Sequence, residues 1–223
     1  MCKPHFGSSF GSVLCGLAGV ATLAFALNSN AADTVRYTTK FGGKVTINGT
    51  STAHDWSMSS GIIQGSLELP AGVTLDPTVA APAGLKAGKL EAKTETQIPV
   101  RSLKGDYSGM DDVMQQAMNA ADHPMIKFVL TEMIFKEPHE AGKPLEFDTK
   151  GELIINGTTN KISFPVTMVA ADKPKIKISG STSVKMSDYK VKAPVLKIGP
   201  VAITTGDDVK IAFEWMVAQA AAK

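Results

Sequence analysis

Histidine and carboxylate side chains are the first residues that could support chemistry in this chain. The sequence has only four histidines, and one of them, His54, is followed directly by Asp55. A histidine beside a carboxylate is the minimal general acid–base pair, and Asp188 offers a further carboxylate. One interpretation is therefore a hydrolase-type enzyme that uses His54 and Asp55.

No recognised motif supports that chemistry. Beyond residue 31 the sequence contains no Gly-x-Ser-x-Gly elbow, no His-x-x-x-His metal pair and no glycine-rich phosphate loop. Adjacent side chains on a loop also need not converge on one substrate. We therefore favour a turn in which His54 and Asp55 bond the backbone, and we expect no catalytic residue, no metal site and no cofactor.

The first 31 residues have the three parts of a signal peptide. MCKPHF forms a basic start, residues 13–27 are apolar, and Ser29-Asn30-Ala31 is a small-x-small cleavage site. A transmembrane anchor is disfavoured because about fifteen apolar residues fall short of the usual ~20. A lipoprotein at Cys15 is disfavoured because Leu14 stands where a small residue is expected. We predict a signal peptide over residues 1–31, cleaved near Ala31, one domain over residues 32–223, and a periplasmic or secreted protein.

Cysteine usage and charge exclude several classes of protein. Both cysteines, Cys2 and Cys15, lie in the predicted signal peptide, so the mature chain would hold neither disulfides nor thiolate sites. Its 192 residues suffice for one well-packed core. Cleavage removes only Lys3, which lowers the formal net charge from +2 to +1. That balance gives no indication of nucleic-acid binding.

Residues 123–168 alternate apolar and polar side chains with the period of two that is typical of half-buried strands. The pair Asn156-Gly157 separates two of these runs and predicts a hairpin. Leu153 and Ile155 lie on the apolar face before the turn, and Phe164 and Val166 lie on it after the turn. The segment therefore predicts an antiparallel sheet with one dry side.

Five further strands follow from the same pattern, at about residues 34–48, 58–69, 89–98, 175–186 and 209–217. The segment 70–88 is rich in Pro, Gly and Ala and has no period, so we expect a mobile loop at one barrel mouth, either a lid or a plain surface loop. Ser108–Ala121 has apolar residues at helical spacing and predicts the one helix.

Eight antiparallel strands, each apolar on one side, best bury their apolar faces by closing into a barrel. Closure also removes exposed strand edges. The predicted fold is therefore all-β: an eight-stranded antiparallel β-barrel with one short α-helix covering an end, preceded by the signal peptide.

Several motifs resemble the YceI-like, polyisoprenoid-binding, lipocalin-like family. They are D-x-P-x-I-x-F at 122–128, G-x-L-x-I-x-G-x-T at 151–159, Pro-Val-Thr at 165–167, G-T-S-T-x-H-D-W at 49–56 and the Asp188-Tyr189 pair. Ser187 and Lys190 stand where the family often has arginine and glycine. The resemblance covers nearly the whole mature chain. It implies a lipocalin-like barrel that binds a long-chain, polyisoprenoid-like lipid. We also expect a monomer or homodimer, no nucleic-acid partner and no transmembrane segment in the mature chain.

An eight-stranded barrel either encloses a ligand or is filled by its own side chains. Small residues on the inward face favour an open lumen that holds a long-chain apolar lipid for carriage or storage. The alternative is a packed-core barrel that acts as a structural or stress-related interaction module. The predicted lumen lining is Leu90, Ala92, Thr94, Thr96, Ile126, Phe128, Leu153, Ile155, Phe164, Val166, Ile178, Gly180, Ile211 and Phe213. The predicted pocket mouth is His54, Trp56, Asp188 and Tyr189, with Trp56 plugging the barrel.

Overall fold

The computed structural model describes residues 34–106 and 108–221, which belong to one compact unit. The predicted signal peptide lies outside these residues. The strands are β1 (Thr34–Thr39), β2 (Lys44–Ser51), β3 (Trp56–Ser60), β4 (Gln64–Pro70), β5 (Gly88–Leu90), β6 (Lys93–Pro99), β7 (Lys104–Gly105), β8 (Met125–Phe135), β9 (Leu145–Ile155), β10 (Thr158–Ala170), β11 (Lys175–Lys185), β12 (Val195–Ile198) and β13 (Val201–Gln219). The helices are α1 (Ser108–Ala117) and the 3-10 turns η1 (Val100–Ser102) and η2 (Ser187–Tyr189). Within the described residues, no helix is long and apolar enough to cross a membrane.

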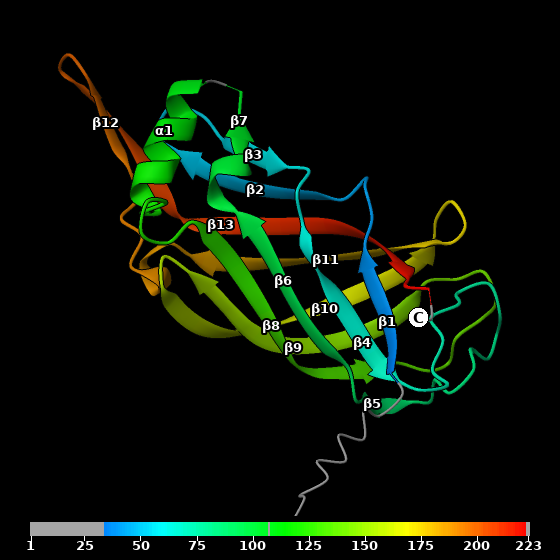
Figure 1. Ribbon diagram of the computed structural model, residues 1–223. Helices are drawn as coiled ribbons and strands as arrows, with labels where there is room; N and C mark the ends of the chain where they lie inside the picture. The colour runs from blue at the N-terminus through cyan, green and yellow to red at the C-terminus, as the bar shows by residue number, and fades with distance from the viewer. Residues whose placement is uncertain (1–33, 107, 222–223) are drawn as a thin grey trace, which may run out of the picture. The chain divides into compact units, whose positions relative to one another are not determined.

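Eight of these strands close an antiparallel barrel (Figure 1). Their order is β1, β4, β6, β8, β9, β10, β11 and β13, and β13 pairs back onto β1. In β9, every second residue from Leu145 to Ile155 is buried, as expected when successive side chains point to opposite faces. The predicted eight-stranded antiparallel barrel is confirmed.

The β9–β10 hairpin turns at Asn156-Gly157, as the sequence predicts. Both residues have positive φ, 49° and 69°, and Ile155 pairs directly with Thr158. A two-residue turn with positive φ at both positions matches the twist of the flanking strands. Asn and Gly tolerate this backbone, so the dipeptide sets the register of the β9–β10 ladder in the barrel wall.

Two predicted strands are each divided by a turn. The run 34–48 forms β1 and β2, and the run 58–69 forms β3 and β4. The long β13 pairs with β1 through Val217 and with β2 through Phe213. One strand thus has two partners, at different positions (heights) along the barrel axis. The prediction of single strands was wrong because alternation continues across each turn.

The last predicted strand is also longer than expected. It begins at Val201 rather than near residue 209, because its first residues pair with β12 in a hairpin. A register shift between Thr205 and Val209 interrupts its pairing with β2. Such an irregularity redirects side chains, and here the Asp207 carboxylate accepts hydrogen bonds from the N–H and hydroxyl of Ser187 in η2.

Residues 70–88 close one end of the barrel, which we call the closed end. Val73, Leu75 and Leu85 are buried, and the N–H of Leu75 donates to the Tyr37 hydroxyl at 3.1 Å. Figure 1 places this loop at the end away from α1. The predicted loop is therefore present, and its apolar side chains pack into the core.

The opposite end, which we call the helix end, is covered by α1 as predicted. The helix ends at Ala117 rather than Ala121, because Asn119 takes a left-handed conformation with φ of 49°. Asp111 ties the helix to β7: its carboxylate accepts from the N–H of Gly105 at 2.8 Å and pairs with Lys104 at 3.0 Å. These two contacts lower the pKa of Asp111.

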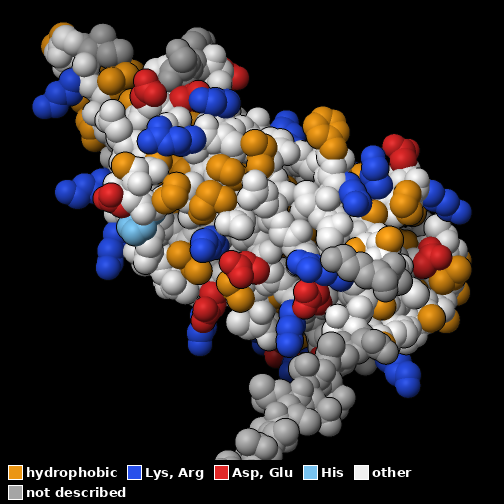
Figure 2. All heavy atoms as spheres, viewed as in Figure 1, with side chains coloured by type: hydrophobic (Ala, Val, Ile, Leu, Met, Phe, Trp, Pro, Cys, Tyr) orange, Lys and Arg blue, Asp and Glu red, His pale blue; other side chains and the backbone are white. Residues whose placement is uncertain are grey.

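Charges on the visible face of the molecule are mixed. Figure 2 shows basic and acidic side chains interspersed, without a large field of one sign. Exposed apolar side chains occur on the β12–β13 hairpin, where Val195, Leu196 and Val201 are half exposed or more.

Candidate ligand-binding cavity

A cavity of about 680 Å³ runs from α1 into the interior of the barrel. This volume falls within the roughly 300–1,000 Å³ typical of small-molecule pockets. None of the closed-end residues Tyr37, Leu69 and Phe147 lines it, whereas Met110, Met114 and Met118 beneath α1 do. The cavity therefore extends from the helix end inward to Met133, Met168 and Trp215, and the residues beyond them pack the closed end.

Most residues of the predicted lining contact this cavity. They come from β6, β8, β9, β10, β11 and β13, whose inward positions alternate as expected. They are Thr94, Thr96, Ile126, Phe128, Leu153, Ile155, Phe164, Val166, Ile178, Ile211 and Phe213. Among the predicted mouth residues, His54, Trp56 and Tyr189 also line it.

Four predicted site residues lie elsewhere. Leu90 pairs with Met133 in the β5–β8 ladder and is part of the packed core. Ala92 lies in the break between β5 and β6 and packs against that core. Asp188 is exposed on η2. For Gly180, a Cβ atom would meet the Phe213 ring at 2.9 Å, so that ring already fills the space beside the glycine.

Three phenylalanines form a cluster in the wall of the cavity. Phe164 lies between Phe128 and Phe213, with ring centroids 5.4 and 5.8 Å apart in tilted and edge-on arrangements. Such geometry is favourable for aromatic rings. The Phe128 ring covers Gly151, where a Cβ would approach it to 2.3 Å. Gly151 and Gly180 therefore accommodate aromatic rings, whereas small inward residues such as Gly180 were expected to leave the lumen open.

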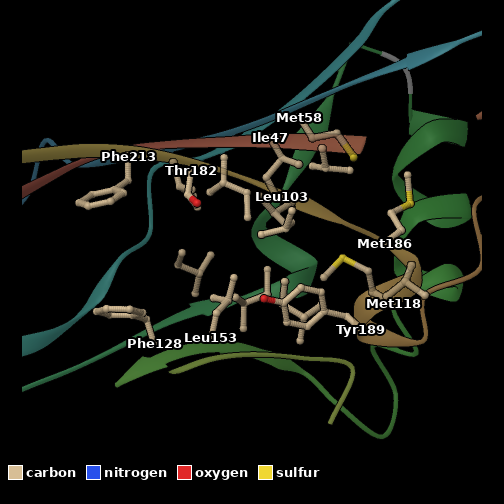
Figure 3. Close-up of a pocket in the computed structure, with 18 of the residues that line it drawn as sticks. Ile47, Met58, Leu103, Met118, Phe128, Leu153, Thr182, Met186, Tyr189 and Phe213 are labelled. Atoms are coloured by element: carbon tan, nitrogen blue, oxygen red, sulfur yellow. The ribbon is translucent and has the colours of Figure 1, made fainter. Parts of the chain in front are cut away.

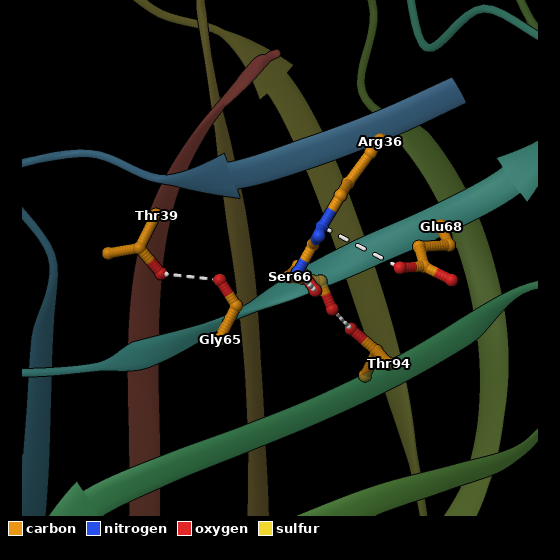
Figure 4. Close-up of polar contacts among 6 residues, drawn as sticks. All are labelled: Arg36, Thr39, Gly65, Ser66, Glu68 and Thr94. Atoms are coloured by element: carbon orange, nitrogen blue, oxygen red, sulfur yellow. Dashed lines mark hydrogen bonds and ion pairs between the residues drawn. The ribbon is translucent and has the colours of Figure 1, made fainter. Parts of the chain in front are cut away.

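The hydroxyls of Thr94 and Thr149 in the cavity wall already donate hydrogen bonds within the protein. Figure 4 shows the Thr94 hydroxyl donating to the carbonyl oxygen of Ser66 on the neighbouring strand. Thr149 donates in the same way to the carbonyl oxygen of Phe164 at 2.6 Å. Because these hydroxyls are already paired, neither needs a hydrogen bond from a ligand.

The His54 region forms a turn at the cavity rim. The His54 Nδ1 lies 2.7 Å from the backbone oxygen of Asp55, and Ser51 Oγ donates to the backbone oxygen of His54 at 2.7 Å. The Trp56 indole donates to the oxygen of Thr50 at 3.1 Å, and its ring packs on Gly49. The imidazole thus engages the backbone of Asp55, which is not the arrangement of an acid–base pair.

Tyr189 is the most unusual polar residue of the wall. Its side chain is only 2% exposed, and its hydroxyl has no hydrogen-bond partner among the described residues. Burial, and to a lesser extent the Asp188 carboxylate, raise its pKa, against a smaller opposing effect of the Asn160 side chain. The Asn160 amide lies outside hydrogen-bond geometry with the phenol and donates instead to the Asp188 carbonyl oxygen at 2.7 Å.

The cavity also has lining residues that the sequence did not indicate. Met58 lies on β3, whose position in the barrel is set by its pairing with β2, and Ile63 lies in the turn between β3 and β4. Leu103 follows η1, and Leu196 and Ile203 belong to the β12–β13 hairpin, which the Gly199-Pro200 dipeptide at its turn could have indicated. His54, Lys185 and Leu196 are exposed lining residues, which places the mouth beside them.

Figure 3 shows how the cavity is arranged. Phe128 and Phe213 lie at one side, and Met118, Met186 and Tyr189 lie near α1 at the other. Every lining residue that is buried is uncharged. In the part of the chain that the structure describes, no cluster of three His, Cys, Asp or Glu side chains could hold a metal ion.

Comparisons with known proteins agree with this architecture. The family model of the YceI-like domain matches residues 64–217. No curated protein matches the sequence. The crystal structure of Burkholderia cenocepacia BcnA is similar, with a TM-score of 0.56 and 20% identity over 80% of this chain and 99% of that one.

A second solved structure is a polyisoprenoid binding domain from Saccharophagus degradans, implicated in plant cell wall breakdown. Its TM-score is 0.56, at 10% identity over 82% of this chain and 98% of that one. At these identities, the two structures show a shared fold. Since the family model spans more than half of the sequence, the chain belongs to the YceI-like family.

Proposed function

We propose that this protein is an exported binding protein that holds a long-chain apolar lipid, a polyisoprenoid or similar, inside its barrel for carriage or storage. The observation that carries the proposal is a cavity of about 680 Å³ whose buried lining is uncharged and largely apolar. Water in such a space lacks polar partners, so an apolar ligand gains from replacing it. The similar structure of a polyisoprenoid binding domain from Saccharophagus degradans supports the same ligand class.

The energetics favour a long chain over a short one. Burial of a methylene is worth about 0.8 kcal/mol, while loss of free translation and rotation costs an estimated 4 kcal/mol or more. Eight methylenes leave little net affinity. About 15 to 20 methylenes give a gross 12 to 16 kcal/mol, which leaves binding on the order of micromolar or tighter.

The helix end offers a pliable cover for such a ligand. Met110, Met114 and Met118 of the α1 region line the cavity together with Met58 and Met186. Methionine side chains are unbranched and polarisable, so they adapt to an irregular apolar chain.

The other interpretations have less support. A packed-core interaction module would need side chains in the space that is hollow next to α1. A hydrolase would need His54 to engage a carboxylate or a nucleophile, whereas its ring bonds a backbone oxygen. Export and a periplasmic location are supported by the signal-peptide pattern of residues 1–31.

Native mass spectrometry of protein purified from its own host, followed by organic extraction, tests the proposal. We expect a mass increment that disappears on extraction and a lipid of about 15 carbons or more in the organic phase. A protein that never carries such a lipid, and that binds none when offered long-chain ligands, would overturn it.

A further inference from the structure

The hydroxyl of Tyr189 has no hydrogen-bond partner in the described part of the chain, unlike the Thr94 and Thr149 hydroxyls in the cavity wall. It is buried with its side chain 2% exposed, and no described group pairs with it. In Figure 3 the ring extends into the cavity with its hydroxyl pointing toward the interior rather than toward the surface. An unpaired buried hydroxyl is unfavourable, and such groups are rare in folded proteins.

The position of Tyr189 is fixed by its surroundings. The Asn156 amide donates to the carbonyl oxygens of Tyr189 and Lys190 at 3.3 and 3.2 Å. The Asn160 amide donates to that of Asp188, and the Asp207 carboxylate holds Ser187. The turn η2 is therefore held by two asparagines of the β9–β10 hairpin and by the irregular part of β13. The phenol is therefore held in the cavity wall with its hydroxyl aimed at the interior, and a ligand reaches the covered oxygen by displacing the side chains next to it.

We propose that the Tyr189 hydroxyl binds the ligand by donating a hydrogen bond to an uncharged carbonyl oxygen, of a ketone or an ester, at the polar end of the lipid. This inference rests on the proposed function and names the chemistry of the ligand's polar end. It also sets the orientation of the ligand: the polar end lies near α1, and the chain runs toward Phe128, Phe164 and Phe213.

Charge explains why the acceptor is neutral. The buried lining residues are uncharged, and the Asp188 carboxylate next to Tyr189 disfavours a second negative charge there. Lys127 and Lys185 are the charged lining residues; neither is buried, and Lys185 is already paired with Asp208 at 3.0 Å. A phosphate or carboxylate end group buried beside Tyr189 would lose its hydration without gaining a counter-charge.

Two probes of equal chain length separate the hydrogen bond from chain burial: octadecan-2-one, a methyl ketone, and octadecane. Their dissociation constants are measured by displacement of a fluorescent fatty probe from the wild-type protein, Tyr189→Phe and Tyr37→Phe. Tyr37 is the matched control because its buried hydroxyl lies at the closed end and accepts from Leu75.

We expect Tyr189→Phe to weaken ketone binding about three- to tenfold and to leave alkane binding unchanged. Tyr37→Phe should change neither. With a 13C-labelled carbonyl, the infrared stretch of the bound ketone should lie at lower frequency in the wild type than in Tyr189→Phe.

The outcomes distinguish the two proposals. If both ligands bind the wild type and Tyr189→Phe changes neither the affinity nor the carbonyl stretch, the inference about Tyr189 is overturned and lipid binding stands. If neither ligand binds the folded wild type, the proposed function is overturned and the inference falls with it.

Discussion

The side-chain amide of Asn160 donates a hydrogen bond to the backbone carbonyl oxygen of Asp188 at 2.7 Å. It joins the β9–β10 hairpin to η2 and so positions the neighbouring Tyr189. We expect Asn160→Ala to lower the free energy of unfolding by about 1 kcal/mol and to reduce the preference of the cavity for a ketone. Urea unfolding and ketone displacement measure the two effects. Thr159→Ala, an exposed neighbour, is the control, and equal behaviour of both variants would contradict the prediction.

In the ligand-free protein, Tyr189→Phe should raise the free energy of unfolding by roughly 1 kcal/mol, because it removes a buried hydroxyl that has no partner. Tyr37→Phe should lower it by about 1–3 kcal/mol, because the N–H of Leu75 loses its acceptor. Chemical denaturation at pH 7 compares the two. A loss of stability in Tyr189→Phe would mean that its hydroxyl has a partner in the free protein.

Alkaline pH provides a separate test of Tyr189. Its folded-state pKa is raised by burial and by Asp188, so the phenol ionises more readily in the unfolded chain. The contribution of this pKa difference to the free energy of unfolding is fully present below a pH of about 10, the usual tyrosine pKa. It is lost as the pH rises through the folded-state pKa. We expect wild-type stability to fall more steeply above pH 10 than that of Tyr189→Phe. Parallel slopes between pH 9 and 11 would argue against a buried phenol.

Acidic pH should loosen α1. The pKa of Asp111 is lowered by the hydrogen bond from Gly105 and by Lys104, so its contribution is present above the ordinary aspartate pKa of about 3.9 and is lost as the pH falls through the folded-state value. Asp111→Asn should lower the melting temperature at pH 7, and the difference from the wild type should shrink as the pH falls below the ordinary aspartate pKa. Asp112→Asn, on the exposed side of the same turn, should have little effect at either pH.

Filling the lumen should block binding. Thr182 lines the cavity, whereas Ser181 next to it is exposed. We expect Thr182→Phe to weaken octadecan-2-one binding at least about tenfold, since several methylenes at about 0.8 kcal/mol each would lose their space. Overpacking costs roughly 1–3 kcal/mol, so circular dichroism must show that the variant is folded. If Thr182→Phe binds as well as Ser181→Phe, the ligand lies outside this cavity.

The period of two in the sequence was sufficient to predict the barrel but not the height of each residue along it. Alternation places Leu90 and Thr94 on the same inward face, yet Leu90 is packed at the closed end and Thr94 lines the cavity. Height depends on which strands pair and where, as when β13 changes partner between β1 and β2. Those pairings join residues far apart in the sequence, which a local pattern does not encode.

The glycines and Tyr189 illustrate a second limit. A small residue predicts open space only if no neighbour enters it, and the Phe213 ring covers Gly180. Likewise, the family resemblance drew attention to the Asp188-Tyr189 pair, but the absence of a partner for the hydroxyl follows from burial that only the three-dimensional fold produces.

The residues that stabilise the fold and the residues that would contact a ligand lie at different ends of the barrel, the packed closed end and the hollow helix end. Phe147, Leu145 and Val217 are fully buried at the closed end, and truncation of such side chains typically costs 2–5 kcal/mol. Most cavity-lining side chains instead border empty space, where a change of size disturbs fewer neighbours. Substitutions that alter the choice of lipid can therefore accumulate at the helix end while the closed end keeps the chain above the stability it needs to fold. A barrel built in this way is a suitable starting point for engineering carriers of other hydrophobic cargo.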